Sequence, residues 1–187
     1  MILSGPSGSG KTTLHEKLLR TKRLKTRLVK TISATTRPRR TGERHGRDYL
    51  FLTPRQFAYR RRTGYFLEKQ KVFGHWYGTP RHAVEKLLKA GKNVLLCIDV
   101  KGARVVRRAY PDVLGIFVKT PSLAVLKKRL RRRGTDTQAT VARRLSIART
   151  ELRDARYYQY VVVNNTLTKA LQRLESIVYR ELVKGYR

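Results

Sequence analysis

The stretch Gly5-Pro6-Ser7-Gly8-Ser9-Gly10-Lys11-Thr12 decides the fold. It matches the pattern G-x-x-x-x-G-K-[ST] at every fixed position, and it lies directly after the apolar segment Met1 to Ser4 and before an expected helix. The glycines let the backbone turn so that successive N–H groups point at phosphate oxygens, and the helix N-terminus adds its dipole. The pattern therefore predicts a nucleoside-triphosphate site in which Lys11 reaches the β- and γ-phosphates.

The same stretch predicts one half of a metal site, because the Thr12 hydroxyl can bind Mg²⁺. Asp99 follows the best buried strand of the sequence, Asn93 to Asp99, and is the second expected Mg²⁺ ligand. A helix N-cap is the alternative role of Asp99, and the two roles are compatible. The expected ATP-binding residues of this stretch are Gly5, Pro6, Ser7, Gly8, Ser9, Gly10, Lys11, Thr12 and Thr13.

Short apolar runs alternate with amphipathic stretches along the chain, which is typical of α/β proteins. The expected fold is a P-loop NTPase fold with three αβα layers and a parallel core sheet. Thr53 and Thr79 each precede a proline, so both are predicted to cap a helix. Strands are expected at 1–4, 28–33, 49–52, 65–73, 93–99, 113–118 and 160–163, and helices at 12–20, 53–64, 79–90, 123–132, 141–152 and 167–182, with a polar connection at 34–48.

The composition excludes several classes of protein. At 40% hydrophobic residues the 187-residue chain can bury a core and is expected to form one domain, residues 1–187. Its single cysteine, Cys97, excludes an intrachain disulfide framework and a thiolate metal cluster. The N-terminus does not resemble a signal peptide, and no apolar run approaches the roughly 20 residues of a membrane span. A cytoplasmic protein with no membrane partner is expected, and the oligomeric state stays open.

The charge of the chain raises a separate hypothesis. There are 44 Lys and Arg against 12 Asp and Glu, a formal net charge of +32. Proteins with such a charge commonly bind polyanions, so a nucleic-acid partner is possible. The basic residues are spread over every expected element, which favours a cationic surface on a folded body as the main interpretation. Self-repulsion should make the fold sensitive to salt.

Residues 33–81 carry the polar groups expected to bind the phosphate acceptor. Arginine and tyrosine side chains offer directed donors to a phosphate. A buried carboxylate among them would suit guanine, whose N1–H and N2–H₂ are adjacent donors, and would reject adenine. For Glu68, however, the residues alone favour a surface strand position beside a neighbouring cation. The set consists of Ser33, Arg37, Arg40, Tyr49, Glu68, Tyr77 and Thr79.

Several further motifs follow in order along the chain, and together they resemble the guanylate kinase family over nearly its whole length. They are Ser33-Ala34-Thr35-Thr36-Arg37, Arg40-Thr41-Gly42-Glu43, Gly46-Arg47-Asp48-Tyr49-Leu50-Phe51, Tyr65-Phe66-Leu67-Glu68, Tyr77-Gly78-Thr79-Pro80, Ile98-Asp99-Val100-Lys101-Gly102-Ala103 and Arg133-Gly134-Thr135-Asp136.

The resemblance implies an enzyme that transfers the γ-phosphate of ATP, with Mg²⁺, to GMP or dGMP. By that resemblance Arg37, Arg40, Tyr49 and Tyr77 hold the GMP phosphate, Glu68 binds guanine N1 and N2, and Ser33 and Thr79 lie near O6. Asp99 lies between acceptor and metal, Asn164 approaches adenine, and Arg133 and Arg144 are lid arginines. The implied catalytic residues are Lys11, Arg37, Asp99, Arg133 and Arg144. The implied regions are a mixed α/β GMP-binding insertion at 33–81, a helical lid at 125–150 and a core made of 1–32, 82–124 and 151–187.

The chain departs from the family pattern at a few positions. Lys101 stands where glutamine is usual, Cys97 where an acid is common, and Asn165 where aspartate is common. Lys69-Gln70-Lys71 replaces a commonly aromatic and acidic stretch. Two alternatives remain at this point: a guanylate-kinase-like binding module without catalysis, which is a different class of protein, and a kinase for another phosphorylated acceptor.

Overall fold

The computed structural model describes residues 1–132 and 137–184 of the chain. Its elements follow one another as β1 (Ile2–Ser4), α1 (Lys11–Leu18), β2 (Leu28–Lys30), β3 (Ala34–Thr35), β4 (Leu50–Phe51), α2 (Pro54–Arg62), β5 (Phe66–Val72), β6 (His75–Pro80), α3 (Arg81–Lys89), β7 (Asn93–Cys97), α4 (Val100–Ala109), β8 (Gly115–Lys119), α5 (Leu123–Arg131), α6 (Gln138–Arg153), the 3₁₀ helix η1 (Asp154–Tyr157), β9 (Tyr160–Val163) and α7 (Leu167–Lys184).

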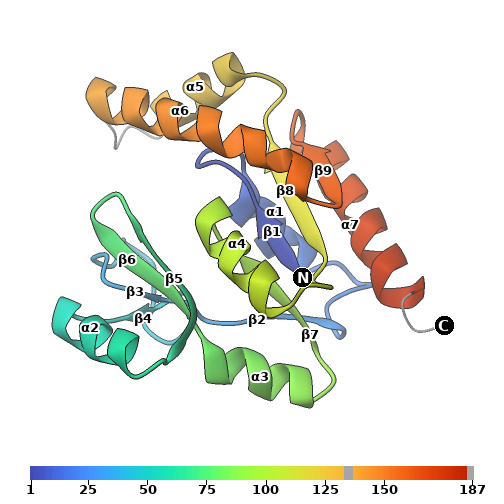
Figure 1. The fold of residues 1–187 in the computed structure, drawn as a ribbon. Coiled ribbons are helices and arrows are strands. Elements are labelled where there is room, and N and C mark those ends of the chain that lie inside the picture. Colours follow the sequence, from blue (N-terminus) through green and yellow to red (C-terminus); the bar gives the residue numbers. More distant parts are fainter. Residues whose placement is uncertain (133–136, 185–187) are drawn as a thin grey trace.

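The core is a five-stranded parallel sheet in the order β2-β7-β1-β8-β9, with helices on both faces (Figure 1). Side chains alternate between the faces, as the period of a strand requires. Leu3 and Leu95 pack with the residues of α1 and α7, while Ile2, Leu96 and Phe117 pack with those of α3 and α4. The three layers and the parallel sheet confirm the expected fold class.

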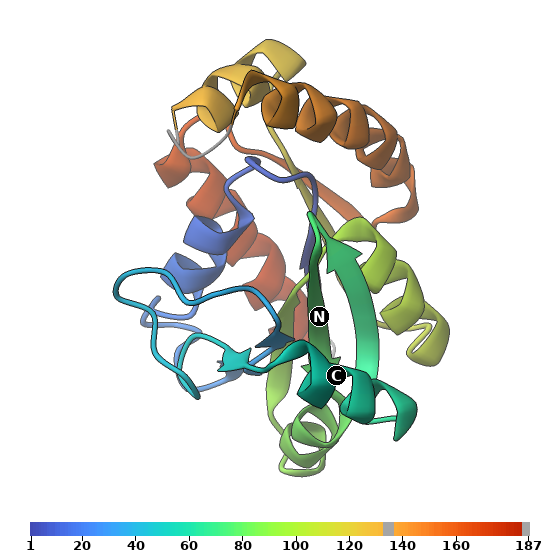
Figure 2. The ribbon, with the colours of Figure 1, turned by 90° about the vertical axis from the view of Figure 1, so that its left-hand side faces the viewer.

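A second, mixed sheet takes all its strands from residues 34–80, in the order β4-β3-β6-β5. Helix α2 covers one face of it, where the rings of Phe57 and Phe66 stack 4.4 Å apart. Thr53 and Gln56 form the predicted capping box at the start of this helix. In Figure 2 this sheet lies in front of the core sheet and below the pair α5 and α6.

Helices α5 and α6 pack on each other through Leu126, Leu130, Val141 and Ala148. The pair lies at the end of the core sheet where β1 runs into the loop 5–10 (Figures 1 and 2). The division of the chain into a core, a GMP-binding region and a lid stays a prediction. Among the described residues, no helix has the length and apolar character that a membrane crossing needs.

Several local predictions were wrong, and helix α4 was not among the expected helices. Thr79 does not cap helix α3, whose N-cap is Pro80 without a side-chain hydrogen bond, because the Thr79 hydroxyl donates to Glu68 instead. Strand β6 was not expected, because its Gly, Trp and His residues do not show the alternation of a half-buried strand. The short strand β3 was not expected either, because it lies in the segment 34–48 that was predicted to be a polar connection. The alternative role of Asp99 is confirmed, because its side chain caps α4.

Candidate active site

The loop of residues 5–12, here called the P-loop, can be built only with glycine at its ends. Gly5 has φ 136°, and a Cβ there would overlap the carbonyl oxygen of Val118 on the neighbouring strand β8. Gly10 is the N-cap of α1 at φ 93°, and its Cβ would overlap Asn164 Nδ2. Lys11 Nζ donates back to Gly5 O at 2.5 Å and to Pro6 O at 3.1 Å. The loop is thus folded around the lysine ammonium group.

Asn164 and Arg129 connect the P-loop to the end of β9 and to helix α5. Asn164 Nδ2 donates to Ser9 O at 2.8 Å, whereas its Oδ1 is buried with no partner among the described residues. Arg129 on α5 donates to Asn164 O at 2.8 Å and to Ser9 O at 3.4 Å. Asn164 was an expected site residue. Arg129 was missed, because in the sequence it is one of many bases on its helix.

Of the two expected lid arginines, Arg144 lies against the P-loop. Its Nη1 donates to Ser7 Oγ at 3.0 Å, and its guanidinium carbon lies 4.2 Å from the centre of the Phe73 ring. Phe73 belongs to the turn between β5 and β6, so Arg144 contacts both the P-loop and the second sheet. Arg133 lies outside the described residues.

Asp99 lies beside the P-loop because strands β1 and β7 are parallel and pair Leu3 with Cys97. Both strands therefore end at the same edge of the sheet, where open α/β sheets bind ligands. Asp99 Oδ1 accepts from Gly102 N at 2.7 Å. Burial raises the pKa of Asp99, and the charge of Lys11 lowers it. The carboxylate is thus capped on one oxygen and near the lysine of the P-loop.

Glu151 on α6 is a partly buried acid in this neighbourhood. Burial raises its pKa to about 7; the positive charge of Lys11 lowers the pKa, and the charges of Asp99 and Asp154 raise it. Glu151 was not an expected site residue. Its only sequence signal is that it is the one acid between Gln138 and Arg153.

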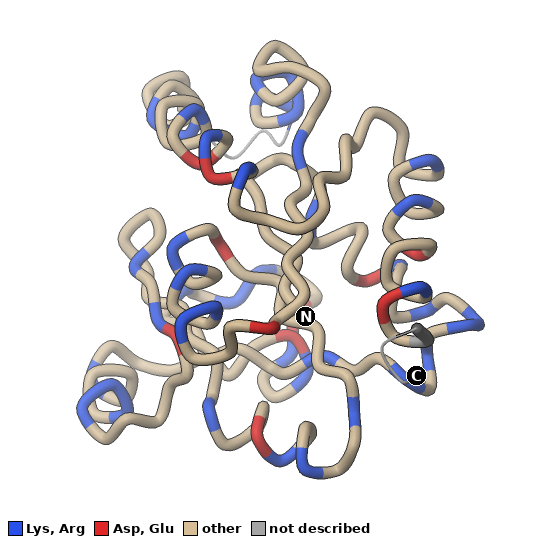
Figure 3. Tube along the Cα trace, turned by 45° about the vertical axis from the view of Figure 1, so that its right-hand side comes forward, with Lys and Arg blue, Asp and Glu red and all other residues tan. Residues whose placement is uncertain are grey.

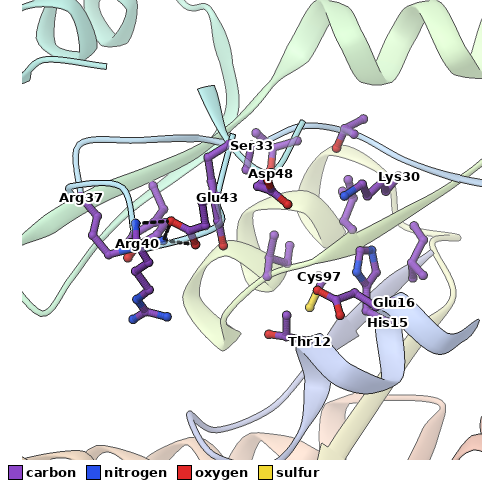
Figure 4. Close-up of a pocket in the computed structure, with 17 residues that line it drawn as sticks. Thr12, His15, Glu16, Lys30, Ser33, Arg37, Arg40, Glu43, Asp48 and Cys97 are labelled. Atoms are coloured by element: carbon purple, nitrogen blue, oxygen red, sulfur yellow. Dashed lines mark hydrogen bonds and ion pairs between the residues drawn. The ribbon is translucent and has the colours of Figure 1, made fainter. Parts of the chain in front are cut away.

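A cavity of about 250 Å³ lies between α1, strand β7 and the second sheet (Figure 4). Its wall also includes His15, which is buried and whose Nε2 has no partner within residues 1–132 and 137–184. Burial, with the nearby charge of Lys30, lowers the pKa of His15 to about 4, so the ring is neutral. Seven of the expected site residues line this cavity: Thr12, Ser33, Arg37, Arg40, Tyr49, Tyr77 and Thr79.

Glu43 accepts hydrogen bonds from both arginines of the cavity, from the side chain of Arg37 and from the backbone of Arg40, as the dashed lines in Figure 4 show. Arg37 Nη2 donates to Glu43 Oε1 at 2.7 Å and to Oε2 at 3.0 Å, and the backbone N of Arg40 donates to Oε2 at 2.8 Å. The guanidinium of Arg37 also lies over the ring of Tyr49, 5.6 Å from its centre. Glu43 was not an expected site residue, although it is the one acid among the many bases of residues 37–47.

Glu68 is buried, with 5% of its surface exposed, so its interpretation as a surface residue is wrong. A bulge between Phe66 and Glu68 brings Glu68 opposite Thr79, and Thr79 Oγ1 donates to Glu68 Oε1 at 2.6 Å. Burial raises the pKa of Glu68 to about 7; the Thr79 hydrogen bond lowers this pKa, and the charge of Asp99 raises it. The structure therefore brings a buried carboxyl group next to the threonine of the cavity.

The residues of the P-loop and the residues of the cavity come together at Thr12 and Asp99. Thr12 follows Lys11 and lines the cavity, and Asp99 is electrostatically coupled to both Lys11 and Glu68. A P-loop after the first strand of a parallel sheet, facing a second pocket of arginines and tyrosines, defines the class of the protein. It is a P-loop NTPase fold with a cavity lined by arginines and tyrosines beside the P-loop.

The comparisons with known proteins name the family. The guanylate kinase family model matches residues 1–181, and the chain belongs to that family. It is 43% identical over 183 residues to the guanylate kinase of Thermotoga maritima, covering 98% of this chain and 87% of that protein. It is 42% identical over 183 residues to the guanylate kinase of Nitrosospira multiformis, covering 98% and 86%. A crystal structure of guanylate kinase from Anaplasma phagocytophilum matches with a TM-score of 0.76 at 32% identity, over 96% of this chain and 84% of that one.

Proposed function

We propose that the protein is a guanylate kinase, an enzyme that transfers the γ-phosphoryl group of ATP to the phosphate of GMP and yields GDP and ADP. The observation that carries the substrate choice is the buried carboxyl group of Glu68, hydrogen-bonded to Thr79 beside the pocket of Arg37 and Arg40. A binding module without catalysis would not need the complete P-loop, and a kinase for another acceptor would not need this buried acid.

GMP fits the cavity with its phosphate and its base at different walls. Arginine forks and phenol hydroxyls give directed donors to the phosphate, and Arg37, Arg40, Tyr49 and Tyr77 supply them. The ionised Glu68 accepts from N1–H and N2–H₂ of guanine, while Ser33 and Thr79 bind near O6. These residues contact base and phosphate only, so dGMP is a substrate as well.

ATP binds with its phosphates on the P-loop and the following Thr13, and with its adenine near Asn164. The unpartnered Oδ1 of Asn164 is an acceptor that an exocyclic amine would satisfy. The oxygen donors of Thr12 and Asp99 are the type that Mg²⁺ prefers, and Mg²⁺ characteristically takes few protein ligands beside the phosphates. These two residues would hold the ion, which neutralises phosphate charge when bound.

The chain's own residues act by positioning and by charge. Lys11, Arg144 and Arg133 neutralise the charge that spreads over the transferring group, and Arg37 holds the acceptor phosphate in line against it. Asp99 lies between the acceptor and the metal ligand Thr12. No general base is needed, because the acceptor oxygen is largely ionised near neutral pH. Approach of α5 and α6 to the second sheet excludes water, which suppresses hydrolysis of ATP.

The test is a coupled ADP-release assay with ATP and Mg²⁺, comparing GMP, dGMP, AMP, CMP and no acceptor. Release that depends on GMP or dGMP is the expected result. Equal release with AMP, or without an acceptor, would contradict the proposal. Folded protein that binds GMP in calorimetry but releases no ADP would make the protein a binding module instead.

A further inference from the structure

Helix α2 and the adjoining part of β5 form a cationic surface that the kinase reaction does not use. We call it the α2 surface and define it by six exposed residues: Arg55, Tyr59, Arg61, Arg62, Lys69 and Lys71. The lysines lie on the sheet face that α2 covers. Lys71 pairs with Trp76, whose ring stacks 5.8 Å from Phe57 of α2, and Lys69 pairs with Gly78, where a Cβ would meet the ring of Phe66.

Within the described residues, the cations of the α2 surface form no ion pairs. Between Asp48 and Glu85 the chain has seven Lys and Arg and one acid, Glu68, which is buried. No carboxylate within residues 1–132 and 137–184 pairs with any cation of the α2 surface, whereas Arg81 and Arg104 elsewhere each have an acidic partner. Figure 3 shows how few acids accompany the Lys and Arg that cover the helices. Such a surface attracts polyanions, whose bound counterions it displaces.

Aromatic rings lie among these cations. Tyr59 is 63% exposed and follows Arg55 by four residues and precedes Arg62 by three, so the three side chains share one face of α2. Arg61 lies over the ring of Trp76, 5.1 Å from its centre, and Arg60 lies over Tyr65 at 5.0 Å. Exposed aromatic rings between cations are how proteins hold unpaired bases, by stacking, while the cations bind the phosphates.

We infer that the α2 surface binds single-stranded nucleic acid, with phosphates on Arg55, Arg62 and the two lysines and a base stacked on Tyr59. The site is separate from the GMP cavity, because side chains alternate along β6. Trp76 and Gly78 face α2, whereas Tyr77 and Thr79 line the cavity on the other face. Binding there leaves GMP binding and kinase activity unchanged.

The experiment measures fluorescence anisotropy of a labelled 12-nucleotide oligouridylate at several NaCl concentrations. Arg55→Gln/Arg62→Gln should weaken binding about tenfold and reduce the slope of log K against log salt by about 1.4, because two phosphate contacts are lost. The matched control, Lys22→Gln/Lys25→Gln, removes the same charge from two exposed lysines after α1 and should change binding less than about twofold. The wild-type GMP kinase activity of both variants shows that they are folded.

A second probe separates base stacking from charge. Tyr59→Leu should weaken oligouridylate binding about fivefold, since stacking on an aromatic ring is lost, and should leave binding of linear polyphosphate unchanged. An equal loss in the Lys22/Lys25 control would overturn the inference in favour of diffuse attraction by the whole surface. Unchanged oligouridylate binding in Tyr59→Leu, an equal loss of polyphosphate binding, or no binding by the wild-type protein at low salt would also overturn it.

Discussion

The carboxyl group of Glu68 lies against the backbone of Gly102: a Cβ on Gly102 would come within 2.6 Å of Glu68 Oε2. Gly102 N also donates to Asp99 Oδ1 at 2.7 Å. The first turn of α4 therefore fixes two acids at once, one expected to bind guanine and one beside the P-loop. The position of the Glu68 carboxyl group therefore depends on how closely this turn approaches β5.

Gly102→Ala should therefore weaken the binding of GMP while changing the free energy of unfolding little. Alanine favours the helix by about 1 kcal/mol, so the free energy of unfolding should not fall by more than about 1 kcal/mol. The added methyl displaces Glu68, and the KM for GMP should rise about tenfold, equivalent to about 1.4 kcal/mol. Steady-state kinetics with each nucleotide checks this. The neighbouring exposed Lys101→Ala is the control, and an equal rise in the KM for ATP would contradict the argument.

The pH dependence of GMP binding should follow Glu68. Its pKa is about 7 in the folded protein against a usual value of 4.5. The folded state thus binds this proton more tightly than the unfolded chain, so the contribution of Glu68 to stability falls as pH rises from about 4.5 to 7. Guanine needs the ionised form, and the KM for GMP should rise as pH falls from 8 to 5.5. Glu68→Gln should lose that part of the pH dependence and discriminate less between GMP and AMP. An identical pH profile in Glu68→Gln would assign the effect to another group.

The sequence predicts correctly those residues whose roles depend on neighbours close in the chain. The residues of the P-loop follow one another directly, and Asp99 lies three positions before the Gly102 N–H that it caps, so local patterns reveal both. The burial of Glu68 could not be predicted from its own segment, because it depends on a bulge in β5 and on the close approach of Gly102, 34 positions away. Arg129 bonds to Ser9 across 120 positions, and nothing in its own segment indicates that contact. Long-range partners therefore account for most of what the sequence analysis missed.

The ion pair between Arg37 and Glu43 gives a prediction for the acceptor phosphate. Arg37→Ala should lower kcat/KM for GMP about a hundredfold or more, the usual effect of removing a group that positions or neutralises transferring charge. Glu43→Gln keeps a hydrogen-bond acceptor but removes the charge that aligns Arg37, and should raise the KM for GMP less than fivefold, about 1 kcal/mol. Circular dichroism verifies the fold of both. A kcat/KM for GMP of Arg37→Ala equal to that of the wild type would contradict the assignment.

The stability of the protein should increase with salt. A net charge of +32 on 187 residues makes the compact state repel itself, and salt shortens the range of that repulsion to about 8 Å at physiological ionic strength. The Tm should rise between 20 and 300 mM NaCl, as measured by calorimetry without nucleotide. Chloride is used because phosphate and sulfate would bind the P-loop and stabilise the fold by mass action. A Tm that stays constant or falls over this range would show that the charges are already compensated.

Phe73 is expected to position Arg144 for phosphate transfer. Among the described residues it is the one non-glycine residue with positive φ, 48°, a conformation that costs about 1 kcal/mol or more. Its ring lies 4.2 Å from the Arg144 guanidinium, which also binds Ser7 of the P-loop at 3.0 Å. Asparagine tolerates positive φ but lacks the ring, so Phe73→Asn should keep or raise the free energy of unfolding in urea while kcat falls about tenfold. Phe73→Tyr keeps the ring and should retain the wild-type kcat. If kcat in Phe73→Asn equals that of the wild type, the ring does not position the arginine.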